Sequence, residues 1–127
     1  LFCHGSPRAD DEIVTALTPP ERLAPMLDAV AEALVVCGHT HHRFDLRAGG
    51  RRVVNAGSVG MPYEGEAGAY WLLVRAGVPE HRRTVYDVDA AATAIRACGY
   101  PDAEDLLRDS VLEPVSAAEA ARTFEPA

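Results

Sequence analysis

The sequence lacks three features that define whole classes of protein. It has no apolar run near the roughly 20 residues needed to cross a bilayer, so no membrane association is expected. Its 12 basic residues form no cluster and are outnumbered by 19 acidic residues, which gives a net charge of −7 and argues against a nucleic-acid-binding surface. Its three cysteines, Cys3, Cys37 and Cys98, have no paired spacing, which favours reduced thiols in a cytoplasmic protein.

The chain has enough hydrophobic residues to form a core. It has 127 residues, of which 48% are hydrophobic and 24% charged, close to the usage of ordinary globular domains. The chain opens at once on the apolar residues Leu1 and Phe2, as if a buried strand had been entered midway. We expect the back part of a longer domain, with a trimmed or processed terminus as the alternative.

Hydrophobic periodicity and turn residues predict the order of the elements. We expect strands at residues 1–3, 34–37, 43–47, 51–55, 69–75 and 82–86. We expect one helix that begins at Thr18, carries an apolar stripe as far as Leu34 and is kinked or restarted at Pro25. Later helices are expected at 89–99, 102–109 and 116–123, the last within a possible tail helix at 111–127. The Ser116-x-x-Glu119 capping box predicts that Ser116 caps this last helix.

This order predicts an α/β (α+β) fold. Buried strands and a helix come first, a mostly antiparallel sheet follows, and helices that cover it come last. Residues 8–17 are predicted to form an exposed connection, and Gly49-Gly50 to form a turn between two strands. Tyr63, Tyr70 and Trp71 are expected to pack in the second sheet.

Four of the five histidines follow predicted strands. His4 follows the first strand, and His39, His41 and His42 follow the strand at 34–37. Ligands of α/β sheets bind beyond the carboxyl ends of strands, and neutral imidazole is the commonest metal ligand. On extended backbone His39 and His41 would point the same way, whereas in a tight turn they would diverge and could meet two different ions.

The other histidines and the remaining polar residues have simpler interpretations. His42 is expected to face solvent and His81 to lie in an exposed turn. Asn55 and Ser58, in a loop rich in glycine, could lie near a substrate, although a structural role is favoured. Cys37 is predicted to be an inert buried thiol, and Arg8 and Arg43 to be surface side chains that flank the histidine loops.

Three segments resemble a known family when they are taken together and in order. Cys3-His4-Gly5-Ser6-Pro7, the run Val35 to His41 with its Gly-His-Thr-His sequence, and Val53 to Gly60 resemble the C-terminal half of calcineurin-like metallophosphoesterases, in particular small bacterial phosphodiesterases. The resemblance runs from Leu1 to about Leu107.

The resemblance implies part of a four-layer αββα sandwich with a site for two divalent metal ions. By that pattern His4 and His39 would bind one ion and His41 the other. Manganese is the preferred expectation, with iron, zinc or nickel as alternatives. The implied reaction is hydrolysis of a phosphomonoester or phosphodiester by a hydroxide that the two metals activate.

The family pattern also requires motifs that this chain does not contain. Asp-x-His, Gly-Asp and Asn-His do not occur in residues 1–127, so the bridging carboxylate and the usual catalytic acid are absent. We therefore assign no catalytic residue and expect the isolated chain to be inactive. By this resemblance residues 1–127 are the C-terminal half of one domain whose N-terminal half is the missing partner, and a homo-oligomer is a further expectation. Two alternatives stay open: a non-catalytic scaffold or protein-interaction module on the same fold, and a self-standing metal-binding module.

Overall fold

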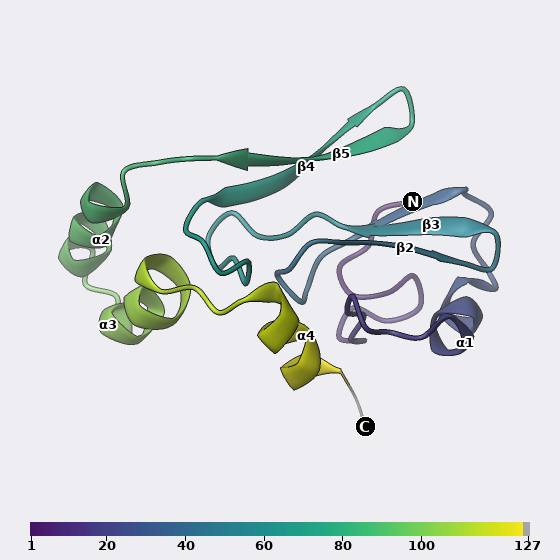
Figure 1. Cartoon of the computed structure of the whole chain (residues 1–127), viewed down its shortest axis with the longest axis horizontal. Coiled ribbons are helices and arrows are strands. Elements are labelled where there is room, and N and C mark those ends of the chain that lie inside the picture. Colours follow the sequence, from purple (N-terminus) through teal and green to yellow (C-terminus); the bar gives the residue numbers. More distant parts are fainter. Residues whose placement is uncertain (126–127) are drawn as a thin grey trace.

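The computed structural model describes residues 1–125, which form two sheets flanked by helices. The first sheet has three strands in the order β1-β3-β2, and the second pairs β4 with β5. The strands are β1 (Leu34–Cys37), β2 (Phe44–Ala48), β3 (Arg51–Asn55), β4 (Ala69–Arg75) and β5 (Val78–Thr84). Figure 1 shows the β4–β5 hairpin above the first sheet, α1 and α4 below it, and α2 and α3 to its left.

The first sheet mixes parallel and antiparallel pairing. β1 pairs with β3 in parallel, and β3 pairs with β2 in antiparallel fashion. The predicted turn at Gly49-Gly50 is confirmed, since both glycines have positive φ (55° and 74°), as a tight hairpin turn with the favoured twist requires. The predicted strand at 1–3 is reduced to a single parallel bridge between Phe2 and Val36 at the outer edge of β1.

The main core lies between the first sheet and two short helices. α1 (Pro20–Leu23) leads directly into the 3₁₀ helix η1 (Ala24–Leu27). The expected change at Pro25 is confirmed, but a helical stripe continuing to Leu34 is wrong, because the helix ends at Leu27 and Leu34 begins β1. The residues of this core are Val14, Leu23, Met26, Leu27, Val30, Val35, Cys37, Phe44, Ala48 and Val53.

Residues 8–17 are only in part the exposed connection that the sequence predicts. Val14 and Thr15 are fully buried, and Thr15 N–H donates to the Thr18 hydroxyl at 2.8 Å. Thr18 therefore does not cap α1, whose N-cap is Pro19. The polar residues around Asp10 dominate the sequence pattern of this segment, although Val14 belongs to the core.

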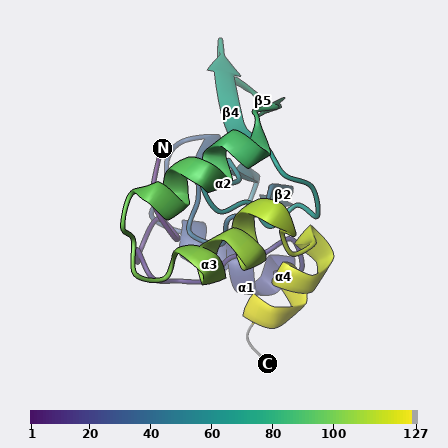
Figure 2. The same ribbon diagram turned by 90° about the vertical axis from the view of Figure 1, so that its left-hand side faces the viewer.

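The second sheet and the last helices form the rest of the molecule. The helices are α2 (Val88–Ala97), α3 (Ala103–Leu106), the π-helix η2 (Leu107–Leu112) and α4 (Ala117–Phe124). Figure 2 shows α2, α3 and α4 gathered on the same side of the molecule. Ser116 caps α4 as predicted, by accepting a hydrogen bond from Glu119 N–H. The last two residues of the expected tail helix lie outside the described part.

A second, smaller core joins α2 to η2 through Ala92, Leu107 and Val111. In the second sheet Tyr70 is buried as expected, whereas Trp71 is 40% exposed. The expectation that Tyr63 packs in this sheet is wrong, because Tyr63 lies in the loop before β4 and packs against His41 and Phe124. Within residues 1–125, none of the helices has both the length and the apolar character that spanning a bilayer would require.

Candidate functional site

His4 is placed by a loop that leaves the edge of the first sheet. Its carbonyl accepts a hydrogen bond from Gly38 N–H at 2.8 Å, which joins this loop to the one after β1. Gly5 allows the next step of the chain, because a Cβ at this position would lie 2.6 Å from the carbonyl oxygen of Asp10. The His4 side chain remains exposed to solvent.

His39 and His41 lie in a tight turn that immediately follows β1. Both have left-handed backbone conformations, with φ of 68° and 57°, which are unusual for residues other than glycine. Their rings diverge, as the turn alternative predicts: the His39 ring packs edge-on against His4 with centroids 4.8 Å apart, and the His41 ring stacks on Tyr63 at 5.7 Å.

The His4 and His39 rings meet through their nitrogens. His4 Nε2 lies 3.1 Å from His39 Nδ1. Two nitrogens bound about 2.1 Å from one metal ion are separated by about 3.0–3.4 Å, so the pair fits two positions of one coordination sphere. Within residues 1–125, no group of three or more His, Cys, Asp or Glu side chains is placed to hold an ion. The described residues thus place two imidazole nitrogens at a spacing that fits one ion, without a complete set of ligands.

His41 has a nitrogen without a partner. Its Nδ1 is buried and makes no hydrogen bond within the described chain. Burial lowers the pKa of His41, the charges of His39 and His4 lower it further, and the backbone of Met61 partly offsets the shift. A neutral imidazole with a free nitrogen is the form that binds a metal ion.

Asn55 holds the histidine turn in place from beneath. Its side-chain NH₂ donates to the Gly38 carbonyl at 2.6 Å and to the Thr40 hydroxyl at 3.1 Å, and its Oδ1 accepts from Gly57 N–H at 2.9 Å. The side chain is completely buried. Ser58, also expected near the site, is half-buried and accepts a hydrogen bond from Met61 N–H at 3.0 Å.

His42 is buried, not solvent-facing as the sequence suggested. Its Nε2 accepts from Ala16 N–H at 3.2 Å, so its Nδ1 carries the proton and donates to the Thr40 carbonyl at 3.1 Å. Burial lowers the pKa of His42, and the Thr40 carbonyl and Glu64 offset part of that shift. The prediction assumed that side chains alternate in direction along extended backbone, but the chain turns at Thr40 and does not continue as a strand.

Comparison with known proteins decides which family this arrangement represents. The profile of the calcineurin-like phosphoesterase superfamily domain matches residues 1–76, which contain all three site histidines. The chain belongs to this superfamily. The match covers the whole first sheet of the mixed fold, whose two sheets are flanked by helices.

Two solved structures share the fold of this calcineurin-like chain. A hypothetical protein from Pyrococcus horikoshii OT3 is 21% identical, with a TM-score of 0.71 over 84% of this chain and 43% of its own. A metallophosphoesterase from Sphaerobacter thermophilus is 23% identical, with a TM-score of 0.70 over 84% of this chain and 52% of its own. The present chain thus spans about half the length of each. No curated protein matches it.

Other polar residues around the calcineurin-like site are occupied by local partners. Arg8 is held by Glu12, and Arg43 by Glu64 with Arg43 Nε 3.0 Å from its carboxylate. His81 is not an exposed turn residue, because it lies in β5 and donates from Nε2 to the Asn55 carbonyl at 2.8 Å.

Sequence reasoning missed the supporting roles of His42, His81 and Tyr63. The two adjacent histidines at 41–42 are a weak signal that one ring faces inward. No neighbouring residue in the sequence indicates a supporting role for His81 or Tyr63. Cys37 is the buried thiol predicted, and burial raises its pKa to about 12.

Proposed function

We propose that the chain supplies part of the metal site of a metal-dependent phosphoesterase. His4 and His39 hold one divalent ion and His41 contributes to a second. The observation that carries this proposal is the 3.1 Å separation of His4 Nε2 and His39 Nδ1 at the ends of two different loops. Family membership supports the same assignment.

The two divalent ions, manganese in preference to iron, zinc or nickel, supply Lewis-acid activation of water and of the phosphate ester when bound. The chain's own residues orient the ligands. Asn55 and Thr40 fix the turn that carries His39 and His41, and His42 holds the Thr40 carbonyl from the core side. The exposed His4 ring leaves the ion reachable from solvent.

The rest of the site comes from a missing N-terminal half of the same domain. The solved relatives are about twice as long as the matched segment, and the motifs for a bridging carboxylate and a catalytic acid are absent from residues 1–127. The substrate is a phosphomonoester or phosphodiester. The three free cysteines support a reducing, cytoplasmic setting.

Calorimetric titration of the metal-free chain with Mn²⁺ tests the ligand assignment. We expect measurable binding that His4→Ala and His39→Ala each weaken at least about tenfold, since each removes one direct ligand. Cys98→Ser is the matched control, because it removes an exposed potential ligand outside the site and leaves Mn²⁺ affinity unchanged. Unaltered affinity in both histidine variants contradicts the proposal.

A turnover assay with bis(p-nitrophenyl) phosphate and Mn²⁺ tests separately whether the isolated chain lacks a complete active site. The chain alone should give rates at background. Robust hydrolysis by the pure chain contradicts the missing-half proposal. Absence of any Mn²⁺ binding favours the alternative of a non-catalytic scaffold.

A further inference from the structure

Tyr63 contacts His41 from outside the histidine turn in two ways. The Tyr63 N–H donates to the His41 carbonyl at 3.1 Å. The Tyr63 ring stacks on the imidazole, with centroids 5.7 Å apart and ring planes inclined by 24°, within the range of attractive aromatic contacts. One residue of a neighbouring loop thus contacts both the backbone and the ring of a site histidine.

The conformation of His41 requires support from its surroundings. Its φ of 57° is left-handed, which costs free energy in a residue with a side chain and persists only where neighbouring contacts maintain it. Asn55 holds the turn through the Gly38 carbonyl and the Thr40 hydroxyl, but these bonds do not involve the His41 imidazole. The stacked Tyr63 ring is therefore the contact that can select one orientation of that imidazole.

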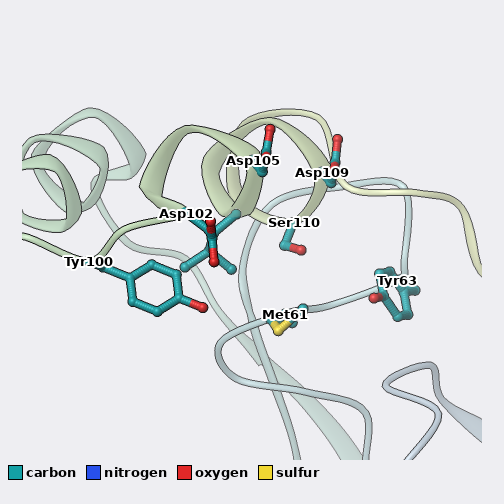
Figure 3. A pocket seen from close by; sticks show the side chains of 8 residues that line it. Met61, Tyr63, Tyr100, Asp102, Asp105, Asp109 and Ser110 are labelled. Carbon is teal, nitrogen blue, oxygen red and sulfur yellow. The ribbon is translucent and has the colours of Figure 1, made fainter.

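Tyr63 is itself restricted by its neighbours. The Phe124 ring packs against it, with centroids 5.7 Å apart and ring planes inclined by 48°. Pro62, which precedes it, is fully buried, and the proline ring fixes its own φ. Figure 3 shows Tyr63 and Met61 on one loop, across the cavity of about 290 Å³ from the α3–η2 segment. These contacts limit the movement of the Tyr63 ring against His41.

Phe124 connects this contact to the C-terminal helix α4, of which it is the last residue. The next residue, Glu125, accepts hydrogen bonds from three side chains of the N-terminal region: Thr15, Thr18 and Arg22. The same N-terminal region reaches the histidine turn, because Ala16 N–H donates to His42 Nε2 at 3.2 Å. α4 lies outside residues 1–76, the part that the superfamily profile matches. A helix beyond the matched region is thus joined to the histidine turn by two routes.

The contribution of Tyr63 to the hydrophobic cores is small. It belongs to neither of the two cores that the described residues form, and it is only half-buried. Removal of its ring is therefore expected to leave both cores intact. The effect on His41 can then be measured in a folded chain.

We propose that Tyr63, supported by Phe124 of α4, is a positioning residue that keeps the His41 imidazole in the orientation needed to bind the second metal ion. Groups that orient a metal-binding imidazole from behind are a general feature of metal sites. The role of His41 as a ligand rests on the proposed function. The orientation of its ring by Tyr63 exists without metal, so it can be tested separately.

NMR of the metal-free chain tests this orientation directly. Three-bond couplings between the His41 backbone and its Cγ report χ1, and so show whether the ring occupies one rotamer or several. We expect one rotamer in wild type, averaged couplings in Tyr63→Leu, and one rotamer again in Tyr63→Phe, which keeps both ring contacts. Tyr100→Leu is the matched control, since it makes the same exchange at an exposed tyrosine just before α3, and it should leave the couplings unchanged.

Further measurements distinguish a loss of orientation from general damage. The His81 ring, bound to the Asn55 carbonyl at 2.8 Å, reports whether the chain is folded and should keep its shifts in every variant. Phe124→Ala removes only the support behind Tyr63, so we expect partial averaging of the His41 couplings. Calorimetry should give an unchanged Mn²⁺ affinity in Tyr63→Leu, because the proposed ligands of that ion are His4 and His39, which Tyr63 does not orient.

The outcomes separate this proposal from the proposed function. Averaged couplings in wild type, or one rotamer in folded Tyr63→Leu, overturn the positioning role; if Tyr63→Leu does not fold, one rotamer in Phe124→Ala overturns it. Equal averaging in Tyr63→Phe or Tyr100→Leu, or a loss of Mn²⁺ affinity in Tyr63→Leu, also overturns it, because the effect would then not be specific to the ring stacked on His41. The expected rotamers in a wild-type chain that binds no Mn²⁺ retain the orienting role of Tyr63 and refute the metal site.

Discussion

His39 and His41 have backbone conformations that cost free energy and must be maintained by their surroundings. Residues other than glycine with left-handed φ store about 1–3 kcal/mol each and occur mostly at functional sites. Here the turn is held by Asn55, by Thr40 and by the core contact of His42. These backbone conformations direct the His39 ring toward His4 and the His41 ring toward Tyr63.

Replacement of Asn55 tests how much this support contributes. Asn55→Ala removes three hydrogen bonds of a buried side chain and leaves Gly57 N–H without a partner, although the Gly38 carbonyl still accepts from Thr40 N–H. We expect it to lower the free energy of unfolding by about 2–4 kcal/mol. Ser58→Ala, which removes one half-buried hydrogen bond, should cost about 0.5–1 kcal/mol. Urea denaturation measures both, and equal losses would contradict a central role for Asn55.

The sequence predicts three histidine ligands, which stay a prediction, but it does not predict the residues that position them. His4 and His39 each stand next to a glycine at a predicted strand end, and His41 follows two residues after His39, so the pattern is local. The roles of His42 and His81 depend on contacts with Ala16 and Asn55, which are distant in sequence and become neighbours only through the fold.

At the scale of elements, strands and turns were predicted better than helix lengths. The Gly49-Gly50 turn and the Ser116 cap are encoded by adjacent residues, so they were found. The helix after Thr18 was overestimated because apolar residues at helical spacing continue past Leu27, where they serve the core without remaining helical. The start of β5 was predicted at residue 82, whereas the strand begins at Val78. The reason is that Pro79 is typical of a turn and is tolerated only at the edge of a sheet.

The C-terminal end of α4 is anchored to the N-terminal region by one carboxylate. Glu125 accepts hydrogen bonds from Thr15, from Thr18 at 3.1 Å and from Arg22 at 2.5 Å. Burial alone would raise the pKa of Glu125, but these three donors together lower it below its usual value. A lowered pKa in the folded state means that the carboxylate stabilises the fold above its ordinary pKa, and that this stability is lost as the pH falls through the lowered value.

We therefore expect Glu125→Gln to destabilise the chain by about 1–2 kcal/mol at pH 7, where the charged hydrogen bonds are lost. The difference from wild type should shrink as the pH falls below the ordinary carboxyl pKa and through the lowered pKa of Glu125, where the carboxyl protonates. Thermal melts from pH 3 to pH 8 measure this dependence. Glu113→Gln, an exposed residue, serves as the control, and a difference for Glu125→Gln that is independent of pH would contradict the anchor.

At the scale of the whole molecule, the first sheet ends on an open apolar edge. The Leu1–Cys3 segment pairs with β1 on one side, and Phe2 is 73% exposed. Unpaired strand edges with apolar side chains associate with other chains. In the proposed complete domain a missing half would cover this region, and in the isolated chain a second copy is the available partner.

Phe2→Lys should therefore raise the monomeric fraction of the 127-residue chain, since a charge at the strand edge opposes pairing. Val85→Lys is the matched control, because Val85 is 72% exposed but lies outside the strands. Sedimentation velocity measures both variants against wild type. A wild-type chain that is wholly monomeric, or equal effects of the two substitutions, would contradict this view of the edge.

The central claim is that the imidazoles of His4 and His39 together bind one divalent ion, and ring ¹⁵N NMR during a Zn²⁺ titration tests it most directly. We predict that His4 Nε2 and His39 Nδ1 shift together and saturate at the same Zn²⁺ concentration, whereas the His81 ring, held by the Asn55 carbonyl, does not shift. If His4 and His39 keep their shifts at saturating Zn²⁺, or move no more than His81, the metal-site assignment is wrong.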